Sequence, residues 1–277
     1  MSIQLTNEQL MLFRTHGYLV VPGFLTAHEL AMYRAESEML VNHCYEQGDL
    51  VANWGCVVEP LGCGYFSDSE ITAGVRTDRT QYAGLRAQVS PRELIQCTLD
   101  KFGYCAQQLL HSQHAVDSDT GPSSSGGVFL LNEQYIVKPP HTQAEFAWHQ
   151  DILYFKPEER SHTVVSIWTP IDDVSLDNGT VWVDPFPDPD RPGKYMHARN
   201  ETPSSQLIKG DPAFATELTA GSALFMDGRL RHCSTGNNTS RFRSAYMPQF
   251  SLGRIEKSSS TGESTACTAF AIPVTKQ

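Results

Sequence analysis

The chain has little basic charge and no long apolar run, and each absence argues against a class of partner. Among 277 residues, 21 Lys and Arg stand against 31 Asp and Glu, for a formal net charge of −10. Such a chain has no electrostatic hold on phosphate backbones or anionic lipids, so we expect neither nucleic acid nor a membrane as a partner. The start, MSIQLTNEQLMLF, has no cationic segment followed by an apolar run, and no later stretch could span a bilayer. We therefore expect a cytoplasmic protein.

Paired cysteines are also lacking. The seven cysteines are odd in number, scattered, and include no CxxC pair. This pattern fits reduced thiols better than a disulfide framework or a zinc knuckle. The apolar content of 40% is ordinary for a protein with a real core, and no internal repeat divides the chain. We expect a single domain over residues 1–277.

The first part of the chain carries helix signals. Two capping boxes, TNEQ and TAHE, predict helices over about 7–15 and 27–47, with a short strand in GYLVVPGF between them. The segment SPRE begins a third helix, with Pro in its first turn. Residues 1–112 are therefore predicted to be mostly helical, apart from an irregular stretch near 49–89.

Beyond a loop rich in Gly, Ser and Pro, the character of the chain changes to strands. The predicted strands are GVFLLNEQYIVK, FAWHQDILYF, TVVSIWTPI, GTVWVDPF, SALFMD and RSAYMPQFSL. They are short, rich in β-branched and aromatic residues, and separated by turn residues. The fold class predicted is mainly β with flanking helices, with a sandwich or barrel core over 128–250. The tail over 255–277 is poor in apolar residues, and we expect it to be mobile.

A candidate metal site begins in FAWHQDILYF. His149 and Asp151 stand two apart, and residues two apart in a β-strand point to the same face. One strand would then offer an imidazole and a carboxylate side by side. His232, at the end of a predicted strand far downstream, could add a second imidazole. Two His and one carboxylate leave one side of a metal open, as at non-heme Fe(II) sites, and zinc with a water could use the same set.

Two arginines follow the distal histidine. Arg241 and Arg243 share a face if their segment is a strand. A guanidinium in a partly buried cavity is suited to gripping a carboxylate through two parallel hydrogen bonds, so either could anchor an acidic co-substrate. A plain surface position is the alternative for each.

The motifs WHQD, DNGT and AGSALFMDGRLRHCSTGNNTSRFRSAY, in this order and spacing, resemble the phytanoyl-CoA dioxygenase family of Fe(II)/2-oxoglutarate oxygenases. The resemblance implies a double-stranded β-helix core of the jelly-roll, cupin-like type. It also implies Fe(II), 2-oxoglutarate as co-substrate and O2, with His149, Asp151 and His232 as the catalytic iron ligands. Succinate and CO2 would be released as the substrate is oxidised.

The same resemblance assigns the co-substrate contacts. Arg243 would bind the far carboxylate of 2-oxoglutarate with help from Ser234, and Arg241 is the rival anchor. Thr180 and Asn132 resemble the other polar contacts of the family. The chain departs from many relatives where DNGTVWVDPFPDPDRPGKY replaces a segment that ends in Pro-Gly-Ser-His, which weakens any transfer of substrate from those relatives.

The substrate is read from the residues expected to border the pocket, which are Phe146, Tyr154, Leu131 and Trp168. Because they are apolar or aromatic, we expect a mostly apolar small molecule of specialised metabolism that undergoes hydroxylation, desaturation or ring rearrangement. The alternatives are an acyl-CoA or amino-acid hydroxylase of the same family, a zinc-dependent cupin-like hydrolase or isomerase, and a non-catalytic binding protein. The oligomeric state stays open, with a homodimer among the alternatives.

Overall fold

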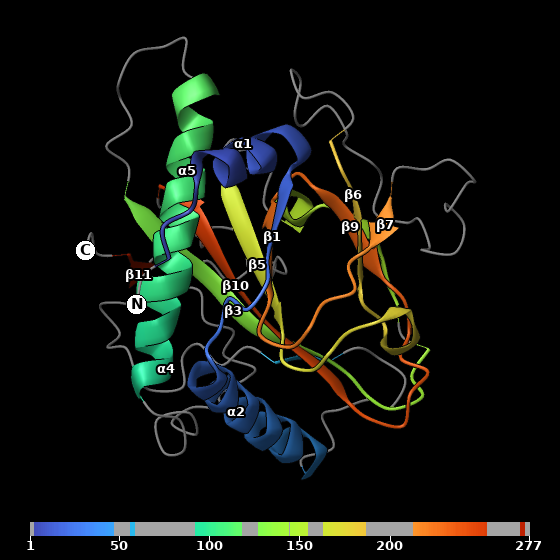
Figure 1. The fold of residues 1–277 in the computed structure, drawn as a ribbon. Coiled ribbons are helices and arrows are strands. Elements are labelled where there is room, and N and C mark those ends of the chain that lie inside the picture. Colours follow the sequence, from blue (N-terminus) through green and yellow to red (C-terminus); the bar gives the residue numbers. More distant parts are fainter. Residues whose placement is uncertain are drawn as a thin grey trace, which may run out of the picture.

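The computed structural model describes residues 3–46, 56–58, 92–117, 127–143, 145–154, 163–186, 213–253 and 272–274. Within these ranges the chain forms two antiparallel sheets, and helices lie on the outer face of the larger one (Figure 1). No helix among the described residues is long and apolar enough to cross a membrane.

Capping interactions define where the first helices begin. The helices are α1 (Asn7–His16), α2 (Ala27–Glu46), α4 (Arg92–Cys97), the π-helical turn η2 (Thr98–Phe102) and α5 (Gly103–Asp117). Thr6 and Gln9 form the predicted capping box of α1, and Thr26 and Glu29 form the same pair of hydrogen bonds at α2. The helices predicted in the first part of the chain are therefore confirmed where the structure describes them.

Among the described residues, the larger sheet has seven strands. Its order is β1 (Tyr18–Val21), β8 (Ala223–Asp227), β5 (Val164–Pro170), β10 (Arg243–Leu252), β3 (Val128–Lys138) and β11 (Ile272–Pro273), with β2 (Cys56–Val58) also paired to β3. Apolar side chains of its outer face, such as Phe225 and Phe250, pack with Phe102 and Leu109 of the helices in one buried cluster. Burial of this face holds the helices on the sheet.

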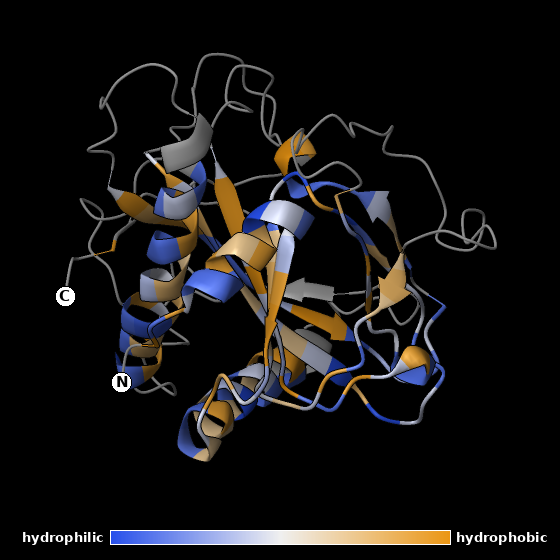
Figure 2. Cartoon of the chain, turned by 45° about the horizontal axis from the view of Figure 1, so that its top comes forward, coloured by the Kyte–Doolittle hydropathy of each residue, from blue (hydrophilic) through white to orange (hydrophobic). Residues whose placement is uncertain are grey.

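The smaller sheet has the order β4 (Phe146–His149), β9 (Arg231–Ser234), β6 (Val181–Asp184) and β7 (Phe214–Ala215). A second apolar cluster joins it to the larger sheet, since Val181 and Val183 pack with Trp168, Leu224 and Met247. The hydropathy view shows apolar segments on both sheets (Figure 2). Two sheets closed over a shared interior form the double-stranded β-helix that the sequence predicted, with helices outside.

One predicted strand is wrong in a way that affects the site. The segment 146–155 was expected to be extended throughout, but β4 ends at His149, and Asp151 begins the 3-10 turn η3 (Asp151–Tyr154). The Leu153 amide closes this turn on the Gln150 carbonyl at 3.0 Å, and the Ile152 amide donates to the Gly228 carbonyl at 2.8 Å, a contact between distant parts of the chain. Strand alternation therefore does not place Asp151 beside His149.

Smaller differences concern other strands. His232 lies inside β9 and not at the end of a strand, and β2, β7 and β11 were not expected. Strands of two or three residues are too short to show an alternating pattern. Much of the predicted tail and of the irregular stretch near 49–89 lies outside the described residues, while β11 within the tail pairs with β3.

Candidate metal and co-substrate site

Two histidines face each other across a pair of strands. His149 of β4 and His232 of β9 are direct partners in the antiparallel register, and their ring centroids lie 4.2 Å apart. Each Nδ1 lies within hydrogen-bond distance of the carbonyl oxygen two residues earlier, 2.7 Å from Ala147 and 3.0 Å from Leu230. A carbonyl oxygen only accepts, so Nδ1 of each ring is the donor, and Nε2 is the nitrogen that remains to ligate a metal.

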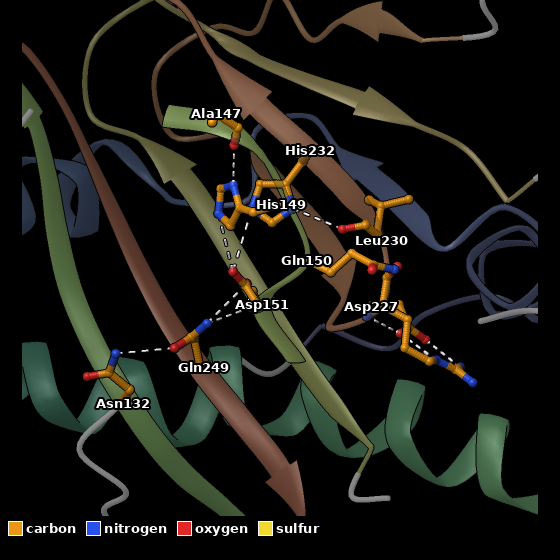
Figure 3. Close-up of polar contacts among 11 residues, drawn as sticks. Asn132, Ala147, His149, Gln150, Asp151, Asp227, Leu230, His232 and Gln249 are labelled. Atoms are coloured by element: carbon orange, nitrogen blue, oxygen red, sulfur yellow. Dashed lines mark hydrogen bonds and ion pairs between the residues drawn. The ribbon is translucent and has the colours of Figure 1, made fainter. Parts of the chain in front are cut away.

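The carboxylate of Asp151 lies close to the Nε2 atoms of both histidines. Its Oδ1 lies 3.7 Å from Nε2 of His149 and 3.6 Å from Nε2 of His232 (Figure 3). The three ligand atoms lie within 4.8 Å of one another, and all three side chains are buried or half-buried. Two neutral imidazoles with a carboxylate are the donor set of non-heme Fe(II) sites, so these residues fit that metal.

The second oxygen of Asp151 is held by residues that the sequence analysis did not single out. Oδ2 accepts from Ser166 Oγ at 2.5 Å and from Gln249 Nε2 at 3.1 Å. Asn132, predicted as a co-substrate contact, donates to Gln249 Oε1 at 3.2 Å. Nothing in their sequence context marks Ser166 and Gln249, because each lies in a strand that carries other polar residues as well.

Arg243 is buried at the start of β10. Its Nη2 donates to the Gly179 carbonyl at 2.8 Å, and weaker contacts reach the carbonyls of Asn178 and Ile136 at 3.4 and 3.3 Å. Burial lowers the pKa of this guanidinium to about 9, against the attraction of Asp172. A buried cation of this kind favours an anionic partner.

The rival anchor has a different environment. Arg241 is exposed and precedes β10, so it does not share a strand face with Arg243. Of the two arginines, only Arg243 lies between the sheets, where its guanidinium is 5.7 Å from the ring centroid of Trp168.

A further buried basic residue, Lys138, was missed because nothing in its sequence context marks it. It ends β3 directly opposite Arg243 in the register, and its side chain is fully buried. Its Nζ donates to the Thr235 carbonyl and lies 5.2 Å from the ring centroid of Phe146. Burial, and after it the charge of Arg243, lower the pKa of Lys138 to about 6, although Glu145 acts in the opposite direction.

The remaining predicted residues divide between the site and the core. Ser234, two residues from His232, is buried between Phe146 and Val181 in the register of the smaller sheet. The hydroxyl of Thr180 donates to the Thr216 carbonyl at 2.6 Å.

The apolar wall residues lie on several elements. Leu131 packs with Ile152 and Leu153 of η3 in a small buried cluster, and Trp168 lies in the cluster between the sheets. Tyr154 ends η3, and its side chain lies outside the described part of the structure.

The family model described as phytanoyl-CoA dioxygenase (PhyH) matches residues 13–245, which is most of the chain. The chain belongs to the phytanoyl-CoA dioxygenase family. It is therefore a member of a family of Fe(II)/2-oxoglutarate-dependent dioxygenases, as its motifs indicated, and His149, Asp151 and His232 have the donor set such an enzyme needs.

Relatives of this PhyH-family chain are distant. It is 24% identical over 264 residues to a phytanoyl-CoA dioxygenase of Arabidopsis thaliana, covering 87% of each chain. It is 29% identical over 273 residues to the mouse phytanoyl-CoA dioxygenase domain-containing protein 1, covering 87% of this chain and 88% of the relative.

Solved structures share the fold. SnoK, a non-heme alpha-ketoglutarate-dependent carbocyclase from nogalamycin biosynthesis, superposes with a TM-score of 0.60 at 16% identity, covering 99% of this chain and 95% of SnoK. EvdO2 from Micromonospora carbonacea, complexed with 2-oxoglutarate, has a TM-score of 0.55 at 19% identity, covering 93% and 95% of the two chains. These likenesses confirm the jelly-roll core.

Proposed function

We propose that His149, Asp151 and His232 hold Fe(II), that Arg243 anchors 2-oxoglutarate, and that the enzyme oxidises a mostly apolar small molecule of specialised metabolism. The observation that carries the proposal is the convergence of two Nε2 lone pairs and one carboxylate oxygen within 4.8 Å. The chemistry supplied there when iron is bound is the oxidative decarboxylation of 2-oxoglutarate by O2, coupled to oxidation of a C–H bond.

The residues of the chain have separate tasks in this reaction. His149 and His232 would ligate the metal through Nε2, because Nδ1 of each ring donates a hydrogen bond to a backbone carbonyl. Arg243 offers a positive charge in a buried setting, where the attraction for a carboxylate is stronger than in water. Ser234 lies two residues along β9 from His232, where its hydroxyl can assist in orienting the co-substrate.

The apolar side chains exclude water from the reacting centre. Leu131 and Trp168 are fully or almost fully buried, and Phe146 is half-buried beside the site. Walls of this kind suit an apolar substrate and protect an oxidising centre from side reactions. SnoK, which shares the fold, is a carbocyclase of nogalamycin biosynthesis, and this supports a substrate from specialised metabolism. The zinc-dependent hydrolase alternative is not retained, because the chain belongs to a dioxygenase family.

The metal assignment is tested by replacing Asp151 with Ala. Substrate-dependent release of succinate should fall to background, because one of three ligands is lost. Glu38→Ala, which removes an exposed carboxylate on α2, is the control and should retain turnover. Near-normal turnover by Asp151→Ala would refute the assignment.

The substrate class is tested by comparing three panels of compounds under the same conditions: polycyclic or terpenoid metabolites, acyl-CoA thioesters and free amino acids. Succinate release above the level without substrate should occur with the first panel. Stronger stimulation by acyl-CoA or amino acids would replace the proposed substrate class and leave the iron site unaffected.

A further inference from the structure

Of the three candidate metal ligands, Asp151 is the one that does not lie in a paired strand. Both histidines belong to paired strands, whereas Asp151 opens the short turn η3 directly after β4. The turn is fastened to the rest of the chain by the Ile152 amide on the Gly228 carbonyl at 2.8 Å. That bond fixes the backbone but leaves the rotation of the carboxylate to its side-chain neighbours.

The two oxygens of the Asp151 carboxylate have different side-chain neighbours (Figure 3). Oδ1 faces Nε2 of His149 and of His232 at 3.7 and 3.6 Å. Oδ2 accepts hydrogen bonds from Ser166 Oγ at 2.5 Å and Gln249 Nε2 at 3.1 Å. A carboxylate with two donors on one oxygen cannot rotate that oxygen toward a metal without losing both bonds.

Further hydrogen bonds fix the orientation of the Gln249 and Ser166 side chains. Gln249 of β10 stands opposite Asn132 of β3 on one side and Ser166 of β5 on the other in the sheet register. Its Nε2 also donates to Ser166 Oγ at 2.9 Å, and its Oε1 accepts from Asn132 Nδ2 at 3.2 Å. This arrangement permits only one orientation of the Gln249 amide, with Nε2 toward Asp151. All three side chains are buried, so water does not compete for these bonds.

We propose that Gln249 and Ser166 are positioning residues that restrict Asp151 to a single ligating oxygen, and so keep further coordination positions on the metal open for co-substrate. The inference rests on the proposed function, because it assumes that the trio binds a metal. Hydrogen-bonded partners behind a ligand set its orientation, and their loss weakens metal binding. Asn132 supports the same carboxylate through Gln249.

The test measures Co(II) binding to the purified, metal-free full chain by absorption titration, with no co-substrate or turnover. Gln249→Leu removes the donor at nearly equal volume, and Ser166→Ala removes only a hydroxyl. Each is expected to raise the Co(II) dissociation constant about tenfold or more. Release of Oδ2 also allows bidentate ligation, so the ligand-field bands of bound Co(II) should change.

The chain offers a matched control in a second buried Gln-Asp pair. Gln113 of α5 donates to Asp227 of β8 at 2.5 Å, and Asp227 is not part of the metal-ligating trio. Gln113→Leu should leave the Co(II) dissociation constant and the ligand-field bands unchanged. Thermal melting of each variant shows whether it is folded. If Gln249→Leu does not fold, the Co(II) dissociation constant and bands of Ser166→Ala test the positioning role.

The outcomes separate the inference from the function on which it rests. Wild-type affinity and wild-type bands in the folded variants would overturn the positioning role while leaving the metal site intact. Equal weakening by Gln113→Leu would also overturn it, because the effect would then be a general loss of packing. Failure of the wild-type chain to bind Co(II) at all would refute the proposed metal site itself.

Discussion

Arg243 and Arg241 lie two residues apart in sequence, yet one is buried between the sheets and the other is exposed. At the scale of single residues, this difference in environment decides which side chain can act on a co-substrate. Arg243 gives its N–H groups to the carbonyls of Gly179, Asn178 and Ile136, which fix its position. A fixed guanidinium loses little entropy when it binds a carboxylate.

The two arginines are compared by replacing each with Met. Arg243→Met is expected to raise the KM for 2-oxoglutarate about tenfold or more, since a charge-assisted hydrogen bond contributes about 1.5–3 kcal/mol. Arg241→Met should change it little. The measurement is initial succinate release against 2-oxoglutarate concentration, with Arg243→Lys as a second variant that keeps the charge. A larger effect at Arg241 would move the anchor there.

Lys138 gives the folded state a pH dependence. Its pKa falls from the ordinary value of 10.5 to about 6, mainly through burial, then through the charge of Arg243. Between these values the unfolded chain binds a proton that the folded chain does not, so stability rises as pH increases through this window. The slope for one proton is about 1.4 kcal/mol per pH unit at most.

Replacing Lys138 with Met should remove this contribution, so that the free energy of unfolding varies less with pH between about 6.5 and 8.5. Urea unfolding of wild type and variant at several pH values in this range measures the difference. Lys101→Met is the control, because Lys101 is also buried but pairs with Glu29 at 2.5 Å. Parallel stability curves for wild type and Lys138→Met would contradict the assignment of the slope to Lys138.

At the scale of elements, the turn before β6 connects the arginine to the smaller sheet. Gly179 has a φ of 79°, and a Cβ added there would lie 2.6 Å from the Thr235 carbonyl oxygen and 2.7 Å from that of Gly236. The turn therefore requires glycine both for its backbone conformation and for the close approach of the neighbouring chain. Its carbonyl also accepts from Arg243.

Gly179→Ala should lower the free energy of unfolding by about 2 kcal/mol or more, since left-handed strain and a backbone clash add together. Gly23 supplies the control: its φ is 60°, but an added Cβ meets nothing within 4 Å. Gly23→Ala should therefore cost only the conformational part, about 1–2 kcal/mol. Urea unfolding of both variants measures the difference, and equal losses would show that the close approach carries no energy.

The elements also show how far sequence reasoning reaches. Strand β10 matches the predicted RSAYMPQFSL, which is bounded by turn residues and carries the aromatic residues Tyr246 and Phe250, and the capping boxes of α1 and α2 are local signals. The turn at Asp151 could not be predicted, because it depends on a carbonyl of Gly228 that is distant in sequence. For the same reason, Gln249 and Ser166 become recognisable only when three strands are aligned.

At the scale of the whole molecule, the proposed iron ligands connect the two sheets. His149 and His232 belong to the smaller sheet, while the carboxylate of Asp151 is held by β5 and β10 of the larger sheet. The general architecture was predictable from the change of composition near residue 128 and from the resemblance of the motifs. The joining of the sheets through one carboxylate was not, because it depends on side-chain contacts between strands.

A metal that ties both sheets together should stabilise the fold as a unit. At a Co(II) concentration of about 100 times the dissociation constant, the free energy of unfolding should rise by about 2.7 kcal/mol. Thermal melting with and without Co(II) measures this, and His232→Ala should abolish the increase. Mg(II) at the same concentration is the control, since it prefers oxygen ligands. No metal-dependent rise in the wild-type chain would contradict the prediction.

The long sequence separations in the larger sheet have a consequence for the order of events on the ribosome. Strand β1 pairs with β8, so its residues Tyr18–Val21 wait for Ala223–Asp227 to be synthesised. At about 5–20 residues per second, that interval is roughly 10–40 s. Asp151 likewise obtains its hydrogen bond from Gln249 only after 98 further residues. A nascent chain therefore cannot hold the Asp151 carboxylate in the proposed orientation until residue 249 has emerged from the ribosome.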